Sequence, residues 1–167
     1  MSNSAYSIRL ATTADIEQIR SLCFLVWPQT YSSIISSEQI EYMLDKMYSP
    51  LSLAQQMEEG AEFILLYNAT QSVGFASYQV ITPTQCKLHK LYMLINEQGK
   101  GGGRILMQYV IDQCKQKGAQ HLELQVNRQN KAVSFYEKLG FYKRETADFD
   151  IGNGFYMNDY IMQIDLV

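Results

Sequence analysis

The chain has 167 residues, of which 47% are hydrophobic and 19% are charged, and its net charge is −3. This balance is typical of a globular protein with a sizeable core and excludes a disordered chain. A negative net charge argues against general nucleic-acid binding. The longest purely apolar run, residues 22–27, is far shorter than the ~20 residues of a membrane span. We therefore expect one domain over residues 1–167 that binds neither nucleic acid nor a membrane.

The charges are unevenly distributed along the chain. Residues 1–80 carry 3 basic and 8 acidic side chains, a balance of −5, whereas residues 87–144 carry 11 basic and 4 acidic ones, a balance of +7. An acidic front half and a basic middle indicate two ligands of opposite charge. Ordinary solvated helix faces explain any single charge equally well.

The cysteines and the N-terminus predict a cytoplasmic protein. Cys23, Cys86 and Cys114 are widely spaced and match no disulfide or zinc pattern, so we expect buried free thiols. Residues 1–4 lack the basic and apolar regions of a signal peptide. Unpaired cysteines are typical of a reducing compartment.

A short strand at residues 7–10 and three helices are predicted in the first third of the chain. Thr12–Thr13 is an N-cap pair for the first helix, whose apolar residues keep helical spacing until Pro28, where we expect the helix to end. Ser36 or Ser37 caps a second helix. Ser49–Pro50 opens a third, since proline is tolerated in a first turn.

The periodicity then changes to that of strands. Strands are predicted at residues 62–68, 72–80, 87–95, 121–126, 141–149 and 155–165, with helices after the glycines at 99–103 and at 130–139. Within 87–95, strict alternation puts Leu88 on the face of Tyr92, and His89 on the opposite face with Met93. Most strands are joined by short turns. The predicted fold is therefore α/β (α+β type), a single mixed, largely antiparallel central sheet of about six to seven strands flanked by helices.

The most informative segment is the glycine-rich turn between a strand and a helix, with the sequence Gln98-Gly99-Lys100-Gly101-Gly102-Gly103-Arg104. Glycine allows the backbone to approach a ligand closely. The helix that follows points its unsatisfied N–H groups and its positive dipole end at the turn. The segment therefore predicts an anion site, and phosphate is the usual anion.

Two familiar phosphate-binding patterns fail here. The P-loop requires a lysine followed by Ser or Thr after its last glycine, whereas Lys100 lies among the glycines. The dinucleotide pattern G-x-G-x-x-G fails because Arg104 stands where its last glycine belongs. A nucleotide-binding protein of either class is thus disfavoured.

A third pattern fits. Gln98-x-x-Gly101-x-Gly103 resembles the [R/Q]-x-x-G-x-[G/A] acyl-coenzyme A loop of the GNAT N-acetyltransferase superfamily. The strand before it, residues 87–93, resembles the strand that leads into this loop. The segment Asn130-x-Ala132-x-x-x-Tyr136-x-x-x-Gly140-Phe141 resembles the family's N-x-A-x-x-x-Y-x-x-x-G-F motif. The order of elements agrees over residues 5–166, so the resemblance implies the GNAT fold and acetyl transfer from acetyl-CoA to an amine.

The resemblance implies a set of coenzyme-binding residues and no metal. They are the backbone of Tyr92, Met93 and Leu94, the turn residues Gln98, Gly99, Lys100, Gly101, Gly102, Gly103 and Arg104, and the side chains of Asn130 and Tyr136. One position departs from the family, which commonly has a branched apolar residue at 102. Three consecutive glycines predict a looser helix start, which orders fully when the coenzyme binds.

Catalytic roles follow from the same resemblance. The amine must lose a proton before it attacks, and the departing thiolate must gain one. Tyr136 is the expected general acid, although it could instead only pack beneath the pantetheine arm. His89 is the expected base because it titrates near neutrality; Glu123 with a water chain and a purely structural histidine are the alternatives.

The acceptor is predicted from the acidic front half. Trp27, Tyr31, Glu38 and Glu41 lie in the region that lines the acceptor cleft in this family, and carboxylates beside aromatic rings suit a cationic amine. Trp27-Pro28-x-x-Tyr31 and residues 157–162 also resemble bacterial polyamine N-acetyltransferases. A polyamine or other small cationic amine is therefore the leading prediction, unless the carboxylates merely solvate a helix. A protein or peptide amino group and a non-catalytic acyl-CoA-binding regulator are the alternatives. Family members are often dimers, so a homodimer is also expected.

Overall fold

The computed structural model describes residues 5–166. Residues 1–4, on which the expectation about a signal peptide rests, lie outside the described residues. Within the described part, no helix has the length and apolar character needed to cross a membrane. Cys23, Cys86 and Cys114 are free and buried, as predicted.

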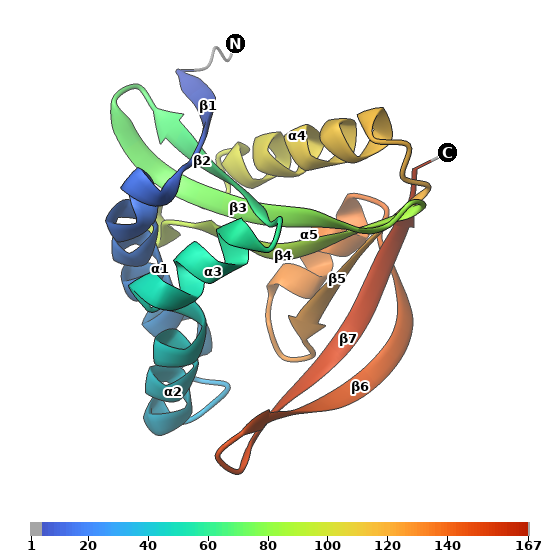
Figure 1. Ribbon diagram of the computed structural model, residues 1–167. Coiled ribbons are helices and arrows are strands. Elements are labelled where there is room, and N and C mark those ends of the chain that lie inside the picture. Colours follow the sequence, from blue (N-terminus) through green and yellow to red (C-terminus); the bar gives the residue numbers. More distant parts are fainter. Residues whose placement is uncertain (1–4, 167) are drawn as a thin grey trace.

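Seven strands form one twisted sheet (Figure 1). Their order in the sheet is β1-β2-β3-β4-β5-β7-β6, and every neighbouring pair is antiparallel except β4 and β5. The strands are β1 (Tyr6–Leu10), β2 (Glu62–Asn68), β3 (Gln71–Thr82), β4 (Gln85–Met93), β5 (His121–Asn127), β6 (Tyr142–Gly152) and β7 (Phe155–Asp165). The prediction of a mixed, largely antiparallel sheet is therefore confirmed.

Helices cover both faces of the sheet. They are α1 (Ile16–Tyr31), α2 (Ser37–Tyr48), α3 (Pro50–Glu58), α4 (Gly102–Gln116) and α5 (Ala132–Lys138). Figure 1 shows α4 on one side of β2–β4 and α1 to α3 on the other. Two apolar clusters follow this division: one is buried under α4 and α5, and the other is buried under α1, α2 and α3. The molecule has a helix–sheet–helix arrangement in which burial of both faces stabilises the fold.

The first helix continues past the proline that was expected to end it. Thr12 and Asp15 form a capping box at a 3₁₀ turn, and α1 runs from there through Pro28 to Tyr31. Proline removes one N–H and strains the preceding turn. The last turn is nevertheless held by packing, because the rings of Trp27 and Tyr31 are 4.5 Å apart and both are buried. Tertiary contacts thus override the local signal, and they carry Tyr31 to the functional region.

A β-bulge in β4 overturns the expected alternation of its side chains. The pairing with β3 shifts between Ser77 and Tyr78, which leaves His89 without a partner opposite. An extra residue in one strand reverses the facing of everything after it. Leu88 therefore lies with Met93 in the cluster under α4, whereas Lys90 packs on the other face, against Tyr48 and Phe63. The predicted shared face of Leu88 and Tyr92 is wrong for this reason.

The parallel strands β4 and β5 pair over only four residues each. Gln85–Leu88 of β4 match His121–Leu124 of β5, and no pairing between these strands follows within the described residues. From the bulge at His89 onwards the two strands diverge. This divergence leaves β4 unpaired with β5 after Leu88, over the part of the strand that leads toward the glycine turn.

Candidate active site

The glycine turn has the backbone that its sequence predicts. Gly99 and Gly101 adopt left-handed conformations with φ of +83° and +93°, and a Cβ at either would meet nothing within 4 Å. The first residues of α4 have no intrahelical acceptor for their N–H groups, and the N-cap residue Gly101 makes no side-chain cap to them within residues 5–166. The Gln98 side chain donates to the Met93 carbonyl at 3.3 Å, which ties the turn to the end of β4. The result is a helix N-terminus with open space beside its first glycines.

Gly102 is required by packing. It is buried, and a Cβ there would lie 2.5 Å from Met93 Cε and 3.0 Å from Leu66 Cδ2. The Met93 and Leu66 side chains therefore occupy the space that a branched apolar residue would take. Without a side chain at residue 102, the start of α4 lies directly on the sheet. Close packing therefore explains the glycine at this position, in addition to the looser helix start that the sequence predicts.

Gly103 brings α5 against the same turn. A Cβ at Gly103 would lie 3.2 Å from the Phe135 ring, so the absence of a side chain lets the two helices approach. The next residue in α5 is Tyr136, which is buried in the cluster under α4 and α5. Lys100 and Arg104 are exposed at the rim of the glycine turn, where Lys100 lies 4.0 Å from a Glu97 carboxylate oxygen. Two cations next to free amides suit a polyanionic ligand.

Three of the predicted site residues meet through their polar groups. The hydroxyls of Tyr31 and Tyr92 are 3.1 Å apart, and Asn130 Nδ2 donates to the Tyr31 hydroxyl at 3.5 Å. Asn130 Oδ1 also accepts from the Ala132 N–H at 2.9 Å, so it holds the start of α5 as an N-cap would. Residues from α1, β4 and the β5–α5 connection thus converge where β4 and β5 diverge. Sequence reasoning had assigned Tyr31 to the acceptor and Asn130 to the coenzyme, and the structure brings them into contact.

Tyr136 is a buried phenol that stays protonated near neutral pH. Its ring packs between Phe135 and Phe141, with centroids 5.3 and 5.7 Å away. Burial raises the pKa of Tyr136 well above its usual range, and the nearby Tyr31 adds to the effect. A neutral phenol at this position is able to donate a proton.

The predicted backbone contacts are partly used within the sheet, where Tyr92 and Met93 pair with Phe75 and Gly74 of β3. The Leu94 N–H donates to the Val73 carbonyl at 2.9 Å, so Leu94 is tied to β3. The Met93 carbonyl accepts from Gln98. A ligand lying along this edge of β4 therefore competes with Gln98 at Met93 or uses the neighbouring groups.

His89 is a weaker base than its position suggested. Burial, together with the charges of Lys90 and Lys87, lowers the pKa of His89 to about 4. One ring nitrogen, Nε2, lies 2.9 Å from Gln79 Oε1. The alternative base, Glu123, already accepts hydrogen bonds from Gln85 at 2.6 Å and from Arg144 at 3.0 Å.

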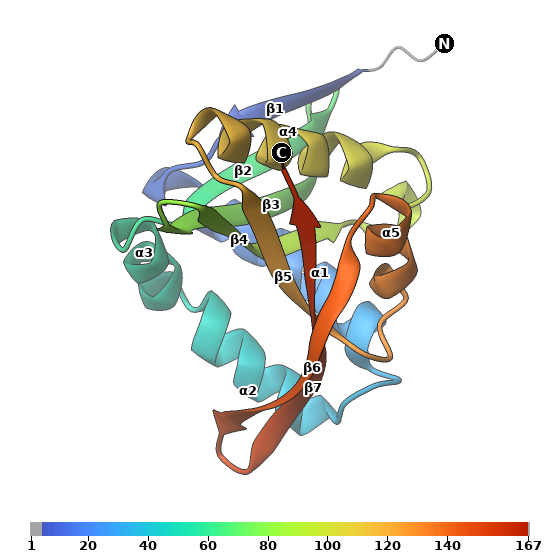
Figure 2. The ribbon, with the colours of Figure 1, turned by 90° about the vertical axis from the view of Figure 1, so that its right-hand side faces the viewer.

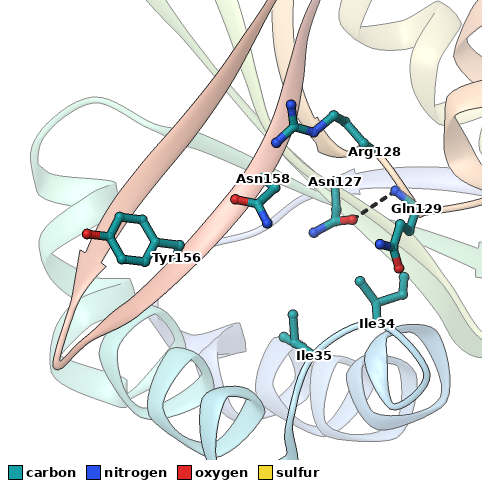
Figure 3. Close-up of a pocket in the computed structure, with 7 residues that line it drawn as sticks. All are labelled: Ile34, Ile35, Asn127, Arg128, Gln129, Tyr156 and Asn158. Atoms are coloured by element: carbon teal, nitrogen blue, oxygen red, sulfur yellow. Dashed lines mark hydrogen bonds between the residues drawn. The ribbon is translucent and has the colours of Figure 1, made fainter.

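A pocket of about 200 Å³ lies between the α1–α2 connection, the end of β5 and strand β7 (Figure 3). Its lining has three side-chain amides, one cation and no carboxylate: Ile34, Ile35, Asn127, Arg128, Gln129, Tyr156 and Asn158. The tip of the β6–β7 hairpin closes against α2, where Tyr42 donates to the Ile151 carbonyl at 2.9 Å (Figure 2). None of these lining residues was predicted, because the pairing of β5 with β7 assembles them from distant segments.

The predicted acceptor residues lie apart from this pocket. Trp27 is only 1% exposed and packs beneath Tyr31 and Tyr92. Glu38 and Glu41 are exposed on α2 and do not line the pocket. Tyr31 is the predicted acceptor residue that the structure joins to the predicted coenzyme residues.

Two buried charged residues were missed. Lys90 and Asp159 are each 6% exposed. The signal for Asp159 was a charge two positions after the apolar Met157 in an alternating strand, and the signal for Lys90 was hidden by the bulge. Burial raises the pKa of Asp159 to about 6, with a contribution from Asp148, while Arg128 and Lys87 oppose the shift.

Comparisons with known proteins agree with this geometry. The sequence model of the family described as "Acetyltransferase (GNAT) domain" matches residues 32–162. The solved structure of PaiA N-acetyltransferase from Thermoplasma acidophilum, in complex with coenzyme A, is 27% identical and has a TM-score of 0.81 over 99% of both chains. The ribosomal-protein-S18-alanine N-acetyltransferase of Escherichia coli is 20% identical, with a TM-score of 0.74 over 96% of this chain and 94% of the other. The latter likeness is one of fold alone.

A curated relative matches part of the chain. The ribosomal protein bS18-alanine N-acetyltransferase of Haemophilus influenzae is 38% identical over 76 residues, which are 46% of this chain and 51% of that protein. The chain thus spans about half the length of this relative in the match. The predicted fold and the predicted family are both confirmed by these comparisons.

Proposed function

The chain belongs to the GNAT acetyltransferase family, and from this premise we propose that it transfers an acetyl group from acetyl-CoA to a primary amine. The proposal is supported chiefly by the region where β4, the glycine turn at 98–104 and α4 meet. It joins free helix amides to a strand edge that β5 leaves unpaired. Tyr136 and Asn130 lie at the same junction.

The residues at this junction fit coenzyme A. The amides of Gly99 to Arg104 would hold the pyrophosphate, with Lys100 and Arg104 as counter-charges. Backbone groups of Tyr92 and Met93 and the Asn130 side chain would hold the pantetheine arm. Acetyl-CoA supplies the acetyl group as a thioester. The chain holds and orients the reactants, which by itself removes much of the barrier to a transfer between two bound groups.

Tyr136 is proposed as the general acid. Its raised pKa keeps the proton on the phenol until a stronger base forms nearby. The leaving sulfur is such a base when it departs as a thiolate. Tyr136 Oη then gives its proton to the sulfur and prevents the reverse reaction.

For the acceptor we propose a peptide α-amino group. The pocket offers the amides of Asn127, Gln129 and Asn158, which match the alternating N–H and C=O groups of a peptide. Its one charged lining residue is Arg128, a cation already paired with Asp148, so the lining itself offers no carboxylate to a second ammonium group. The curated relative acts on an alanine of a ribosomal protein, and this agrees with a peptide acceptor.

A polyamine or other small cationic amine is the second candidate. The observation that favours it is the buried Asp159 carboxylate near the Tyr31 ring, since a carboxylate beside an aromatic ring attracts a cation. It remains second because the exposed row containing Glu38 and Glu41 does not extend into the pocket.

Thiol release from acetyl-CoA tests the proposal directly. We would measure initial rates with a short peptide that begins with alanine, with the same peptide acetylated at its N-terminus, and with spermidine. We expect turnover with the free peptide and none with the blocked one. Faster turnover with spermidine than with any peptide would favour the second candidate. Tight coenzyme binding without turnover on any amine would favour a non-catalytic acyl-CoA-binding protein.

A further inference from the structure

Asp159 is a buried carboxylate in β7, close to the pocket and separate from the acid step assigned to Tyr136. It is the one Asp or Glu of residues 5–166 in the buried class, with 6% of its surface exposed. Its Oδ1 atom is buried and has no hydrogen-bond donor within that part of the chain. Buried charges are normally paired, so a free oxygen here indicates a donor that the protein itself does not provide.

The position of Asp159 connects the pocket with the tyrosines. In the sheet it pairs with Asn127 of β5, and Asn127 and Asn158 both line the pocket. Asp159 is also close enough to Tyr31 to act on it by charge: the pKa of Tyr31 is raised to about 12, chiefly by burial but also by the charge of Asp159. Tyr31 in turn contacts Tyr92 and Asn130 at the end of β4. Asp159 thus lies between the proposed entry of the amine and the proposed position of the thioester.

Three other carboxylates of strands β5, β6 and β7 are engaged. Glu123 is bonded to Gln85 and Arg144. Asp148 forms an ion pair with Arg128, and Asp165 lies 2.9 Å from His121 Nδ1. The charged groups that act on Asp159 are Arg128 from the β5–α5 connection, Asp148 from β6 and Lys87 from β4, together with the titratable Tyr31 from α1.

We propose that Asp159 is the catalytic base that takes the proton from the ammonium form of the acceptor, directly or through one water. This inference rests on the proposed function. One proton passes from the nitrogen to the Asp159 carboxylate, and the freed lone pair forms the C–N bond to the acetyl carbon. The C–S bond breaks with its electrons on sulfur, which takes the Tyr136 proton. The nitrogen gives its second proton to the Tyr136 phenolate, and Asp159 releases its own to solvent.

The chemistry of the two candidate acceptors bears on this role. A peptide α-amino group has a pKa of about 8 and an alkylamine one of about 10.4, so Asp159, at about 6, is nearer to the former. An uphill proton transfer of about two pKa units is compatible with turnover. A difference of more than about four units would slow the transfer much more. Asp159 is also a stronger base than His89, whose pKa is about 4.

The test compares Asp159→Asn with Asp159→Glu and with the matched control Asp165→Asn, a carboxylate at the exposed end of the same strand. We would measure kcat at saturating substrates from pH 5 to 9, and the Kd for coenzyme A as a readout of folding. The wild type should lose kcat below about pH 6 as Asp159 is protonated. Asp159→Asn should lower kcat at pH 7.5 by about 100-fold or more, lose this acid limb and bind coenzyme A normally. Asp159→Glu should retain more activity and keep an acid limb, and Asp165→Asn should behave as the wild type.

The outcomes of this test separate an error in the role of Asp159 from an error in the proposed acetyl transfer. If the wild type turns over and Asp159→Asn has the same kcat and the same acid limb, the assignment of Asp159 is overturned and the proposed function stands. If Asp159→Asn raises only the KM for the amine, Asp159 binds the acceptor and the role as base is overturned. If the wild type binds coenzyme A but acetylates no amine, the proposed function fails and the inference falls with it.

Discussion

At the scale of single residues, one physical cause prepares two groups for opposite tasks. Burial raises the pKa of the Tyr136 phenol and of the Asp159 carboxyl, because it disfavours the charged form of each. The phenol consequently keeps a proton to give. The carboxylate becomes a stronger base than an exposed aspartate while it remains ionised at neutral pH. Separate pKa values for the two groups are what proton donation and proton acceptance require.

The Tyr136→Phe variant tests the acid. The ring packing against Phe135 and Phe141 is kept, and only the proton donor is removed. We expect kcat to fall by about 100-fold or more, while the Kd for coenzyme A measured by calorimetry stays close to the wild-type value. A leaving group that does not need protonation, such as a nitrophenyl thioester, should restore part of the rate. Full activity of the variant with acetyl-CoA would remove Tyr136 from this role.

His89 offers a comparison between candidate bases. Because its pKa is about 4, it is neutral at pH 7 and accepts a proton weakly. We expect the fall in kcat caused by His89→Gln to be at least about tenfold smaller than the fall caused by Asp159→Asn. The rates of both variants would be measured side by side at pH 7.5. A larger fall in kcat for His89→Gln than for Asp159→Asn would identify His89 of β4 as the base instead.

At the scale of elements, the site depends on how α4, α5 and β4 meet. The bulge at His89 ends the pairing of β4 with β5. At the start of α4, Gly102 lets the helix pack closely on the sheet and Gly103 lets it pack closely on α5. Much of this could be predicted: the glycine pattern and the Asn130–Phe141 motif are local, so sequence spacing indicates them. The bulge could not be predicted, because strict alternation fits the sequence equally well until a partner strand imposes its register.

Gly102→Val tests the packing of the α4 start. Its Cβ would lie within 3.0 Å of Met93 and Leu66 side-chain atoms, so we expect the free energy of unfolding to fall by about 1–3 kcal/mol. Urea denaturation measures the loss. Met93→Ala should make room, so that the double variant is more stable than the sum of the two single effects predicts. Strict additivity would contradict the proposed steric cause.

At the scale of the whole molecule, two apolar clusters fill the two sides of one sheet, and the pocket forms where the α1–α2 connection meets β5 and β7. Sequence periodicity predicted nearly all of the helices and strands, since these depend on local spacing. The pocket and Asp159 depend on the pairing of β5 with β7 and on the closure of the β6–β7 hairpin against α2. Such contacts join residues about 30 to 120 positions apart, which short sequence patterns do not encode. The predicted acidic row on α2 was visible in the sequence, but it faces solvent.

Lys90 makes the stability of the whole fold depend on pH. Its ammonium is buried, donates to Gln56 Oε1 at 2.8 Å and lies 5.1 Å from the centre of the Tyr48 ring. Burial, with the charge of Lys87, lowers the pKa of Lys90 to about 8. Between this value and about 10.4 the unfolded chain binds more protons than the folded one, so the free energy of unfolding rises with pH in that window.

Lys90→Met removes this buried charge. We expect the variant to be more stable than the wild type at pH 7 by about 1–3 kcal/mol, because no charge has to be desolvated. The difference should shrink as the pH rises from 8 to 10, and urea denaturation at each pH would show it. A variant that is less stable than the wild type at every pH would mean that the Gln56 and Tyr48 contacts outweigh desolvation.

Transfer of a labelled acetyl group to an amine is the decisive measurement for the proposed activity. Wild-type protein would be incubated with acetyl-CoA labelled in its acetyl group and a peptide that begins with alanine, and the peptide would then be analysed by mass spectrometry. We expect the label to appear on the peptide α-amino group, and Tyr136→Phe to slow its appearance while coenzyme binding persists. Bound coenzyme A with no labelled peptide or polyamine would contradict the proposed activity.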